Sequence, residues 1–235
     1  GILAMVCDST NVFNDKASGS EASVHSDLLK HVTESRGRVV VTTFASNSAR
    51  LQTLADVARE AGRKLCFAGR SLHKIVEASQ ATGYLKNLPE MVDMEAVDAF
   101  PRNQVMVVAT GGQGEARAAL ARIAEGNHPV KLEEGDTVIF SSKQIPGNEM
   151  AIGHVMNQLA RRNIIMVTEK QAHVHVSGHP GRSELAKLYE WVKPEILVPV
   201  HGERRHMAEQ ARFAHEQGVR KTIVQSNGDV IRLAD

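Results

Sequence analysis

The chain has 235 residues, of which 28 are basic and 27 acidic, and its formal net charge is +1. This balance excludes a polybasic nucleic-acid binder but not a local groove for phosphates. Cys7 and Cys66 cannot build a disulfide framework, and no apolar run approaches the roughly 20 residues of a membrane-spanning helix. We therefore expect a cytoplasmic protein that does not cross a membrane. The first residues, GILAMVC, read like a buried strand, so we also expect the chain to be an excerpt of a longer one.

Short apolar runs rich in β-branched residues alternate with segments of helical spacing. The runs that predict strands are 38–45, 64–69, 105–110, 137–142, 164–169 and 196–201. The segments that predict helices are 22–35, 48–61, 72–83, 114–125, 148–161, 181–192 and 203–217. This alternation predicts a doubly wound α/β fold, in which a mostly parallel sheet carries helices on both faces. Near the end, Asn227-Gly228 between two apolar runs predicts a hairpin over 222–234.

Polar segments follow most of the predicted strands directly. In a parallel sheet, ligands gather at the carboxyl ends of the strands, where the N–H groups of helix N-termini suit phosphate. The segments are DSTN (8–11), FASNSAR (44–50), AGRS (68–71), ATGGQGE (109–115), SSKQIPGNE (141–149), HVSGHPG (175–181) and VHGE (200–203). Any one of their serines and asparagines is explained equally well as a helix cap. So many of them along one edge favour an anion-binding surface.

The segment HVHVSGH (173–179) places a histidine or serine at every second position. This period of two predicts a strand with its valines packed on one side and a row of imidazoles on the other. A second group, PVHGERRH (199–206), places His201 at the end of a predicted strand. Two adjacent strands could bring His179 and His201 together, with Asp8 as the acid that orients an imidazole.

Such a cluster suits metal-assisted phosphodiester hydrolysis. A neutral imidazole is a good zinc ligand, and a second imidazole can hold a phosphate oxygen or protonate a leaving group. The cluster is incomplete as a zinc site, because zinc takes three or four protein ligands and the HxHxDH motif of metallo-β-lactamase hydrolases does not occur in the chain. The alternative is that His179 and His201 are two polar residues at strand ends, satisfied by their neighbours.

Seven motifs together resemble one enzyme family in their order and spacing. They are DSTN, TFASN, GRS, TGGQGE, IPGNE, HVSGH and KPEILVPVHGERRHM (193–207). The chain resembles the second half of the catalytic region of ribonuclease J, a bacterial enzyme of the β-CASP branch of the metallo-β-lactamase superfamily. The resemblance implies that 20–172 are the whole β-CASP domain. It also implies that 1–19 and 173–235 are segments of the metallo-β-lactamase αββα fold on either side.

The same resemblance implies roles for individual residues. Asp8, in the DST motif, and His179, in SGH, match catalytic residues, and His201, in PVHGE, matches a metal ligand. The stretch from His175 through Val176, Ser177 and Gly178 to His179 matches the segment that holds the substrate phosphate. Phe44, Ser46, Asn47 and Arg70 match residues in the loops of the family's enzymes that face the RNA.

The function implied is that of a two-zinc ribonuclease in RNA maturation and decay. Its substrate would be single-stranded RNA with a 5′-monophosphate, degraded from the 5′ end or cut internally, and the full-length enzyme would be a homo-oligomer. We expect most zinc ligands to lie upstream of Gly1, so that this chain alone is inactive and binds zinc weakly. Two alternatives are an RNA- or phosphate-binding module without catalysis and a phosphosugar isomerase-like protein, although an isomerase would not need the SGH and PVHGE pair.

Overall fold

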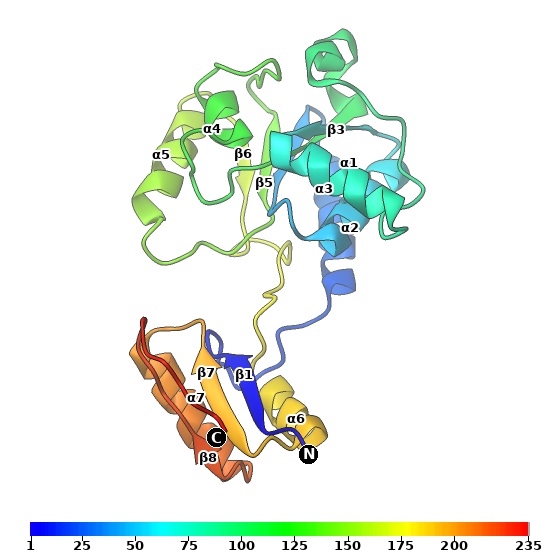
Figure 1. Ribbon diagram of the computed structural model, residues 1–235. Helices are drawn as coiled ribbons and strands as arrows, with labels where there is room; N and C mark the ends of the chain where they lie inside the picture. Colours follow the sequence, from blue (N-terminus) through cyan, green and yellow to red (C-terminus); the bar gives the residue numbers. More distant parts are fainter. Residues whose placement is uncertain (235) are drawn as a thin grey trace. The chain divides into compact units, whose positions relative to one another are not determined.

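The computed structural model describes residues 1–234, which form two compact units (Figure 1). We name the unit that runs from Ser20 to Val176 the inserted unit, and residues 1–19 together with those from Ser177 onward the split unit. The sequence led us to expect an insert over 20–172, and the assignment of these units to two domain types stays a prediction. No helix among the described residues is long and apolar enough to span a membrane.

The inserted unit contains a five-stranded sheet in the order β3-β4-β2-β5-β6, and all of its strand pairings are parallel. The strands are β2 (Val39–Thr42), β3 (Lys64–Ala68), β4 (Val105–Ala109), β5 (Thr137–Phe140) and β6 (Ile165–Val167). Each lies inside a predicted apolar run. Since successive side chains point to opposite faces, β2 contributes Val39 and Val41 to one buried cluster and Val40 to another.

Helices cover both faces of this sheet, which confirms the doubly wound α/β prediction. One face packs against α1 (His25–Glu34), α2 (Ser48–Glu60) and α3 (Arg70–Ala81), and the other against α4 (Ala119–Ala124) and α5 (Glu149–Ala160). Short 3-10 turns occur at η1 (Glu21–Val24), η2 (Met94–Ala99) and η3 (Arg102–Gln104). The predicted helix over 114–125 begins only at Ala119, because the backbone before it turns through Gly111 and Gly114, both at positive φ.

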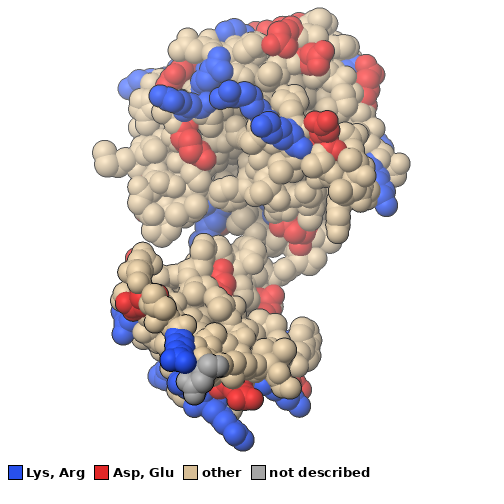
Figure 2. All heavy atoms as spheres, in the orientation of Figure 1, with Lys and Arg blue, Asp and Glu red and all other residues tan. Residues whose placement is uncertain are grey.

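The split unit contains a three-stranded parallel sheet in the order β1-β7-β8. Its elements are β1 (Ala4–Asp8), β7 (Ile196–Val200), β8 (Lys221–Thr222), α6 (Arg182–Val192) and α7 (Arg204–Glu216). Cys7 and Leu197 pack with Leu185 of α6 and Phe213 of α7 in one buried cluster. Figure 2 shows basic and acidic side chains interspersed on the visible face of each unit, in keeping with the balanced composition.

Two sequence predictions of strands are wrong. Residues 173–179 form no strand: the N–H of His173 donates to the Asp27 carboxylate and that of Val174 to the carbonyl of Ala172, so no ladder forms. The hairpin over 222–234 is also absent. The N–H of Ile223 donates to the carbonyl of Leu197, so this part of the tail continues along β7 instead of pairing with the second apolar run.

Two arginines of the inserted unit are fully buried at opposite edges of its parallel sheet. Arg38 directly precedes β2 at the amino edge and donates to the Asp98 carboxylate at 2.6 Å. Arg50 lies in the first turn of α2 and donates to the carbonyl of Ser141, which follows β5 at the carboxyl edge, at 3.1 Å. Burying a guanidinium costs free energy unless its donors are paired. Arg50 pairs all three of its nitrogens, whereas Arg38 pairs Nη1 and Nη2 and leaves Nε without a partner among the described residues.

We expect Gly114→Ala to destabilise the chain far more than Gly126→Ala. Both glycines have positive φ, +75° and +78°, so either alanine carries the roughly 1–2 kcal/mol cost of the left-handed region. A Cβ at Gly114 would also clash with the main-chain carbonyl group of Ala151 in α5, whereas one at Gly126 meets nothing within 4 Å. Overpacking adds about 1–3 kcal/mol. Urea unfolding measures both losses, and equal values would contradict the tight packing of the 110–118 loop on α5.

Candidate functional site

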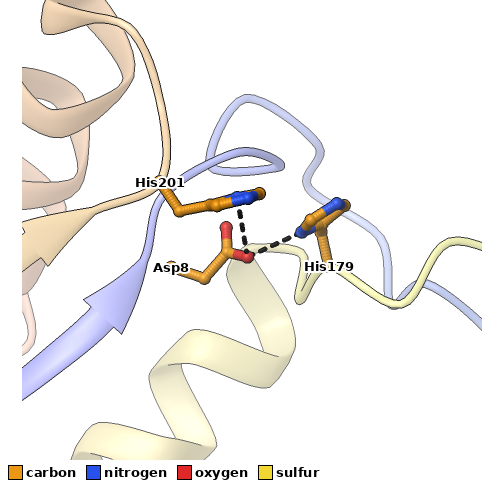
Figure 3. A group of neighbouring side chains, drawn as sticks. All are labelled: Asp8, His179 and His201. Carbon is orange, nitrogen blue, oxygen red and sulfur yellow. Dashed lines mark hydrogen bonds and ion pairs between the residues drawn. The ribbon is translucent and has the colours of Figure 1, made fainter. Parts of the chain in front are cut away.

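Asp8, His179 and His201 form one cluster in the split unit (Figure 3). The parallel register of β1 and β7 pairs Asp8 with Val200, so the residue that follows, His201, lies beside the carboxylate. His179 reaches the same place from the segment that precedes α6. The nitrogen and oxygen atoms that these three side chains offer all lie within 4.8 Å of one another. The structure thus brings together the three residues that the sequence predicted as catalytic or metal-binding.

Asp8 holds His179 through a direct hydrogen bond of 2.6 Å between Oδ2 and Nδ1. An ionised carboxylate only accepts, so Nδ1 carries the proton and Nε2 is the nitrogen presented outward. Burial by itself would raise the pKa of Asp8, but hydrogen bonds from the Thr10 N–H and from His179 lower that pKa below its usual value. Asp8 is therefore ionised at neutral pH and fixes the tautomer and the orientation of His179.

His201 has a strained backbone conformation, and its Nδ1 edge is held by neighbouring side chains. Its φ is +55°, in the left-handed region that residues other than glycine rarely adopt and that concentrates at functional sites. The Thr10 hydroxyl contacts the carbonyl oxygen of His201 and lies 2.9 Å from its Nδ1, and Asp8 Oδ2 lies 3.4 Å from the same nitrogen. Because the imidazole is 67% exposed, Nε2 is the atom available to a metal ion.

The rings of His179 and His201 stack with their centroids 5.1 Å apart, so the two imidazoles form one surface. The side chain of His179 is 38% exposed, which keeps its outer edge accessible. With both Nδ1 atoms directed to Asp8 or Thr10, the two rings offer their Nε2 atoms to a ligand. This is an arrangement that can bind a cation with one imidazole and an anionic oxygen with the other.

Asn11 and Ser18 hold the turn that carries His179. The Asn11 amide donates to Ser177 Oγ at 3.0 Å and to the carbonyl of His179 at 2.9 Å, and the Ser18 hydroxyl also donates to that carbonyl. Ser177 Oγ in turn accepts the N–H of His179 at 3.1 Å, while Gly178 is exposed. The sequence singled out DSTN as a motif but gave Thr10 and Asn11 no role, because their partners lie far along the chain.

Glu184 closes the same turn at the start of α6. Its Oε2 accepts the N–H groups of Ser18 and Gly181, each at 2.9 Å. These two hydrogen bonds lower the pKa of Glu184 below its usual value. The helix end, the 1–19 segment and the turn at His179 are thereby joined through one carboxylate.

The other predicted site residues lie in the inserted unit. Phe44 is exposed and lines a cavity of about 150 Å³ with Ser71, Thr110 and Gly112, at the carboxyl ends of β2, β3 and β4. Ser46 and Arg70 are exposed, and Arg70 is the first residue of α3.

Asn47 acts as a helix cap in this structure. Its Oδ1 accepts the Arg50 N–H at 3.0 Å, and its Nδ2 donates to Glu21 at 3.1 Å. Val176, also among the predicted substrate-binding residues, is buried in the core of the inserted unit.

His175 is largely buried, and its Nδ1 has no hydrogen-bond partner among the described residues. Burial, and after it the nearby Arg50 guanidinium, lower the pKa of His175 to about 4. The imidazole is therefore neutral at physiological pH and is able to form hydrogen bonds but no ion pair. His173, by contrast, is exposed and lies 2.8 Å from the Ser23 hydroxyl.

Two family models match this chain. Residues 36–159 match the model described as ribonuclease J, beta-CASP domain, which covers more than half of the 235 residues. The chain belongs to the ribonuclease J β-CASP family. Residues 164–224 match the model described as a Zn-dependent metallo-hydrolase RNA specificity domain, and this stretch includes His175, His179 and His201.

Curated relatives agree with this assignment. The chain is 42% identical to ribonuclease J of Sinorhizobium meliloti over 235 residues, which are 100% of this chain and 42% of that protein. It is 35% identical to ribonuclease J of a Synechocystis species over 99% of this chain and 37% of that protein. It is 34% identical to ribonuclease J2 of Bacillus subtilis over 99% of this chain and 42% of that protein. The chain thus spans about two fifths of the length of these relatives.

The donor set of the cluster fits the metal use that the second family model implies. Imidazole nitrogen and carboxylate oxygen are both ordinary zinc ligands, and His201 Nε2 is accessible. Asp8 is already engaged by His179 and Thr10, so within the described residues His201 is the clearest ligand. The match to the second family model therefore supports metal-dependent chemistry, and His201 is the residue of the cluster that is best placed to bind the metal.

We expect Glu184→Gln to destabilise the chain at pH 7 by about 1 kcal/mol or less, because a neutral amide accepts the two N–H groups more weakly. The carboxyl pKa is lowered on folding from 4.5, so its stabilising effect is present above that pH and is lost as the pH falls through the folded value. Urea unfolding at pH 7 and near pH 3 measures the difference. Glu190→Gln, at an exposed position of α6, is the control. A loss that is equal at both pH values would contradict the role of the ionised carboxylate.

Proposed function

We propose that this chain is part of a metal-dependent ribonuclease that hydrolyses RNA phosphodiester bonds. The observation that carries the proposal is the Asp8–His179 hydrogen bond beside the accessible imidazole of His201. The family assignment supports the same reaction, since the relatives are named ribonuclease J. The roles below are those that this geometry supports best.

In this proposal His201 is a ligand of one zinc ion in a two-zinc centre. Bound zinc supplies a hydroxide at neutral pH and stabilises negative charge on the phosphate. Asp8 keeps His179 oriented through Nδ1. When Nε2 is protonated as well, the imidazolium donates that proton to a phosphate oxygen or to the departing 3′ oxygen, which leaves the Nδ1–H tautomer that Asp8 holds. Thr10 and Asp8 hold the His201 ring where it stacks on that of His179.

The segment from His175 to His179 is proposed to bind the substrate phosphate. Its donors are the neutral imidazole of His175, the Ser177 hydroxyl and the accessible edge of His179, with Val176 buried as an anchor and Gly178 exposed. Phe44, Ser46, Asn47 and Arg70 are proposed to contact single-stranded RNA, with Phe44 as a stacking surface. The chain has only nine aromatic residues, two Tyr, six Phe and one Trp, so phosphate and backbone contacts would dominate.

The substrate is proposed to be RNA with a 5′-monophosphate, cut from the 5′ end or internally during rRNA processing and mRNA decay. The whole enzyme is proposed to be a cytoplasmic homo-oligomer. This chain by itself is proposed to be inactive and to bind zinc weakly.

The test uses the whole natural protein that contains this sequence. Single-stranded RNA with a 5′-monophosphate or a 5′-triphosphate is incubated with Zn²⁺ or Mn²⁺, and mononucleotide release is followed. We expect faster release from the monophosphate RNA and a loss of roughly 10²–10⁴-fold in the His179→Ala variant, the range for a removed general acid. His154→Ala is the control, because His154 is exposed on α5 of the inserted unit.

Two outcomes would count against the proposal. Equal rates for wild type and His179→Ala, with both proteins folded, would remove His179 from catalysis. No metal-dependent cleavage of either RNA would sink the ribonuclease function and favour the alternative, a phosphate- or RNA-binding module without catalysis.

A further inference from the structure

Arg50 is a completely buried cation, with 0% of its side chain exposed. Its guanidinium pairs with the Glu21 carboxylate in a two-point arrangement: Nε donates to Oε2 at 2.8 Å and Nη2 to Oε1 at 3.1 Å. Asn47 Nδ2 donates to the same carboxylate at 3.1 Å, so Glu21 is held from two sides. A pair of this kind has a fixed geometry, because the planar fork of arginine matches the two carboxylate oxygens.

The remaining nitrogen of Arg50 holds the backbone that leads to His175. Nη1 donates to the carbonyl of Val174 at 3.2 Å and to the carbonyl of Ser141 at 3.1 Å, and it also contacts the Ser141 hydroxyl. That hydroxyl donates to the Val174 carbonyl at 2.8 Å. One carbonyl oxygen, immediately before His175, therefore accepts two hydrogen bonds, both of them buried.

The hydrogen bonds to the Val174 carbonyl are not part of any helix or strand. Residues 173–176 belong to no strand, so the Val174 carbonyl has no ladder partner to fix it. The side chains of Val174 and Val176 are buried in the core, which leaves the His175 ring between two fixed neighbours. Within the inserted unit, Arg50 thus joins the 3-10 turn that carries Glu21, the end of β5 and the segment that carries His175.

We propose that Arg50 is a positioning residue for His175, which it places by holding the Val174 carbonyl and the Glu21 carboxylate at fixed positions. The inference rests on the proposed function of the 175–179 segment in binding substrate phosphate. Arg50 itself touches no substrate, since it has no exposed surface.

The charge of Arg50 acts on the same ring. Burial and the guanidinium both lower the pKa of His175, and the other charged groups that act on this pKa are Glu21 and Lys143. A neutral imidazole has one N–H donor, so the direction in which it donates depends on where the ring is held. Small displacements of the backbone at Val174 would therefore change phosphate binding more than they change the chemistry at His179.

The first experiment compares Arg50→Lys with Arg38→Lys in the whole natural protein. Lysine keeps the charge but cannot form the two-point pair. For Arg50→Lys we expect KM for 5′-monophosphate RNA to rise roughly tenfold while kcat stays within about twofold, the signature of lost binding. Arg38 is equally buried and also donates to a carboxylate and main-chain carbonyls, but at the amino edge of the sheet, so its variant should change neither constant.

The second experiment does not depend on ribonuclease activity. NMR of the histidine ring nitrogens follows the titration of His175 in this chain, in wild type and in Arg50→Met combined with Glu21→Gln, which leaves no carboxylate unpaired. We expect the titration midpoint of His175 to rise from about 4 in the double variant. It should stay unchanged in Arg38→Lys.

The outcomes separate the two proposals. A normal KM for Arg50→Lys, or an equal rise for Arg38→Lys, overturns the positioning role, and so does an unmoved midpoint in the double variant. If the wild type cleaves neither RNA, the proposed function fails. The proposal that Arg50 improves the binding of substrate phosphate by positioning His175 then fails as well. The NMR titration then still decides whether the Arg50–Glu21 pair acts on the His175 ring.

Discussion

The parallel pairing of β1 with β7 is the constraint on which the candidate site depends. It joins residues 4–8 to residues 196–200 in a fixed register, so the carboxylate at the end of one strand and the histidine just beyond the other must meet. The intervening chain is longer than the unit that it interrupts, and its own five-stranded sheet is complete in itself. The site is therefore built by topology: residues 8 and 201 become neighbours because two parallel strands end at the same edge.

Hydrogen bonds then hold the residues at the carboxyl edge of this sheet in place. Thr10 and Asn11, just after β1, hold the backbone at His201 and at His179, and Glu184 ties the turn at His179 to the start of α6. Each of these hydrogen bonds is modest in net free energy, about 1 kcal/mol, but together they hold the backbone that carries both imidazoles. The left-handed backbone at His201 is a strained conformation that the surrounding structure maintains beside the stacked rings.

Much of this was predictable from residues alone, and the failures have physical causes. The apolar runs predicted the five strands of the larger sheet, β1 and β7 of the smaller one, and the helices on both faces of the larger sheet, because burial imposes the same periodicity whatever the neighbours are. They did not predict β8, which pairs with β7 where a hairpin was expected. The alternation in 173–179 predicted the burial of Val174 and Val176 correctly but the strand wrongly, since period two reports burial and not the presence of a pairing partner. Arg50 could not be predicted, because a charged residue in the first turn of a helix normally faces water and its partners at 21, 141 and 174 are distant in sequence.

The proposed function requires that His201 bind a catalytic metal beside the Asp8–His179 pair. The most direct measurement is zinc-edge anomalous diffraction from crystals of the whole natural protein, wild type and His201→Ala, soaked in Zn²⁺. We expect a strong anomalous peak at coordination distance, about 2.0–2.1 Å, from a ring nitrogen of His201 in the wild type, and a weakened or absent peak in the variant. A peak of equal strength in both proteins, away from residue 201, would contradict it and would make His201 a structural residue of the strand end.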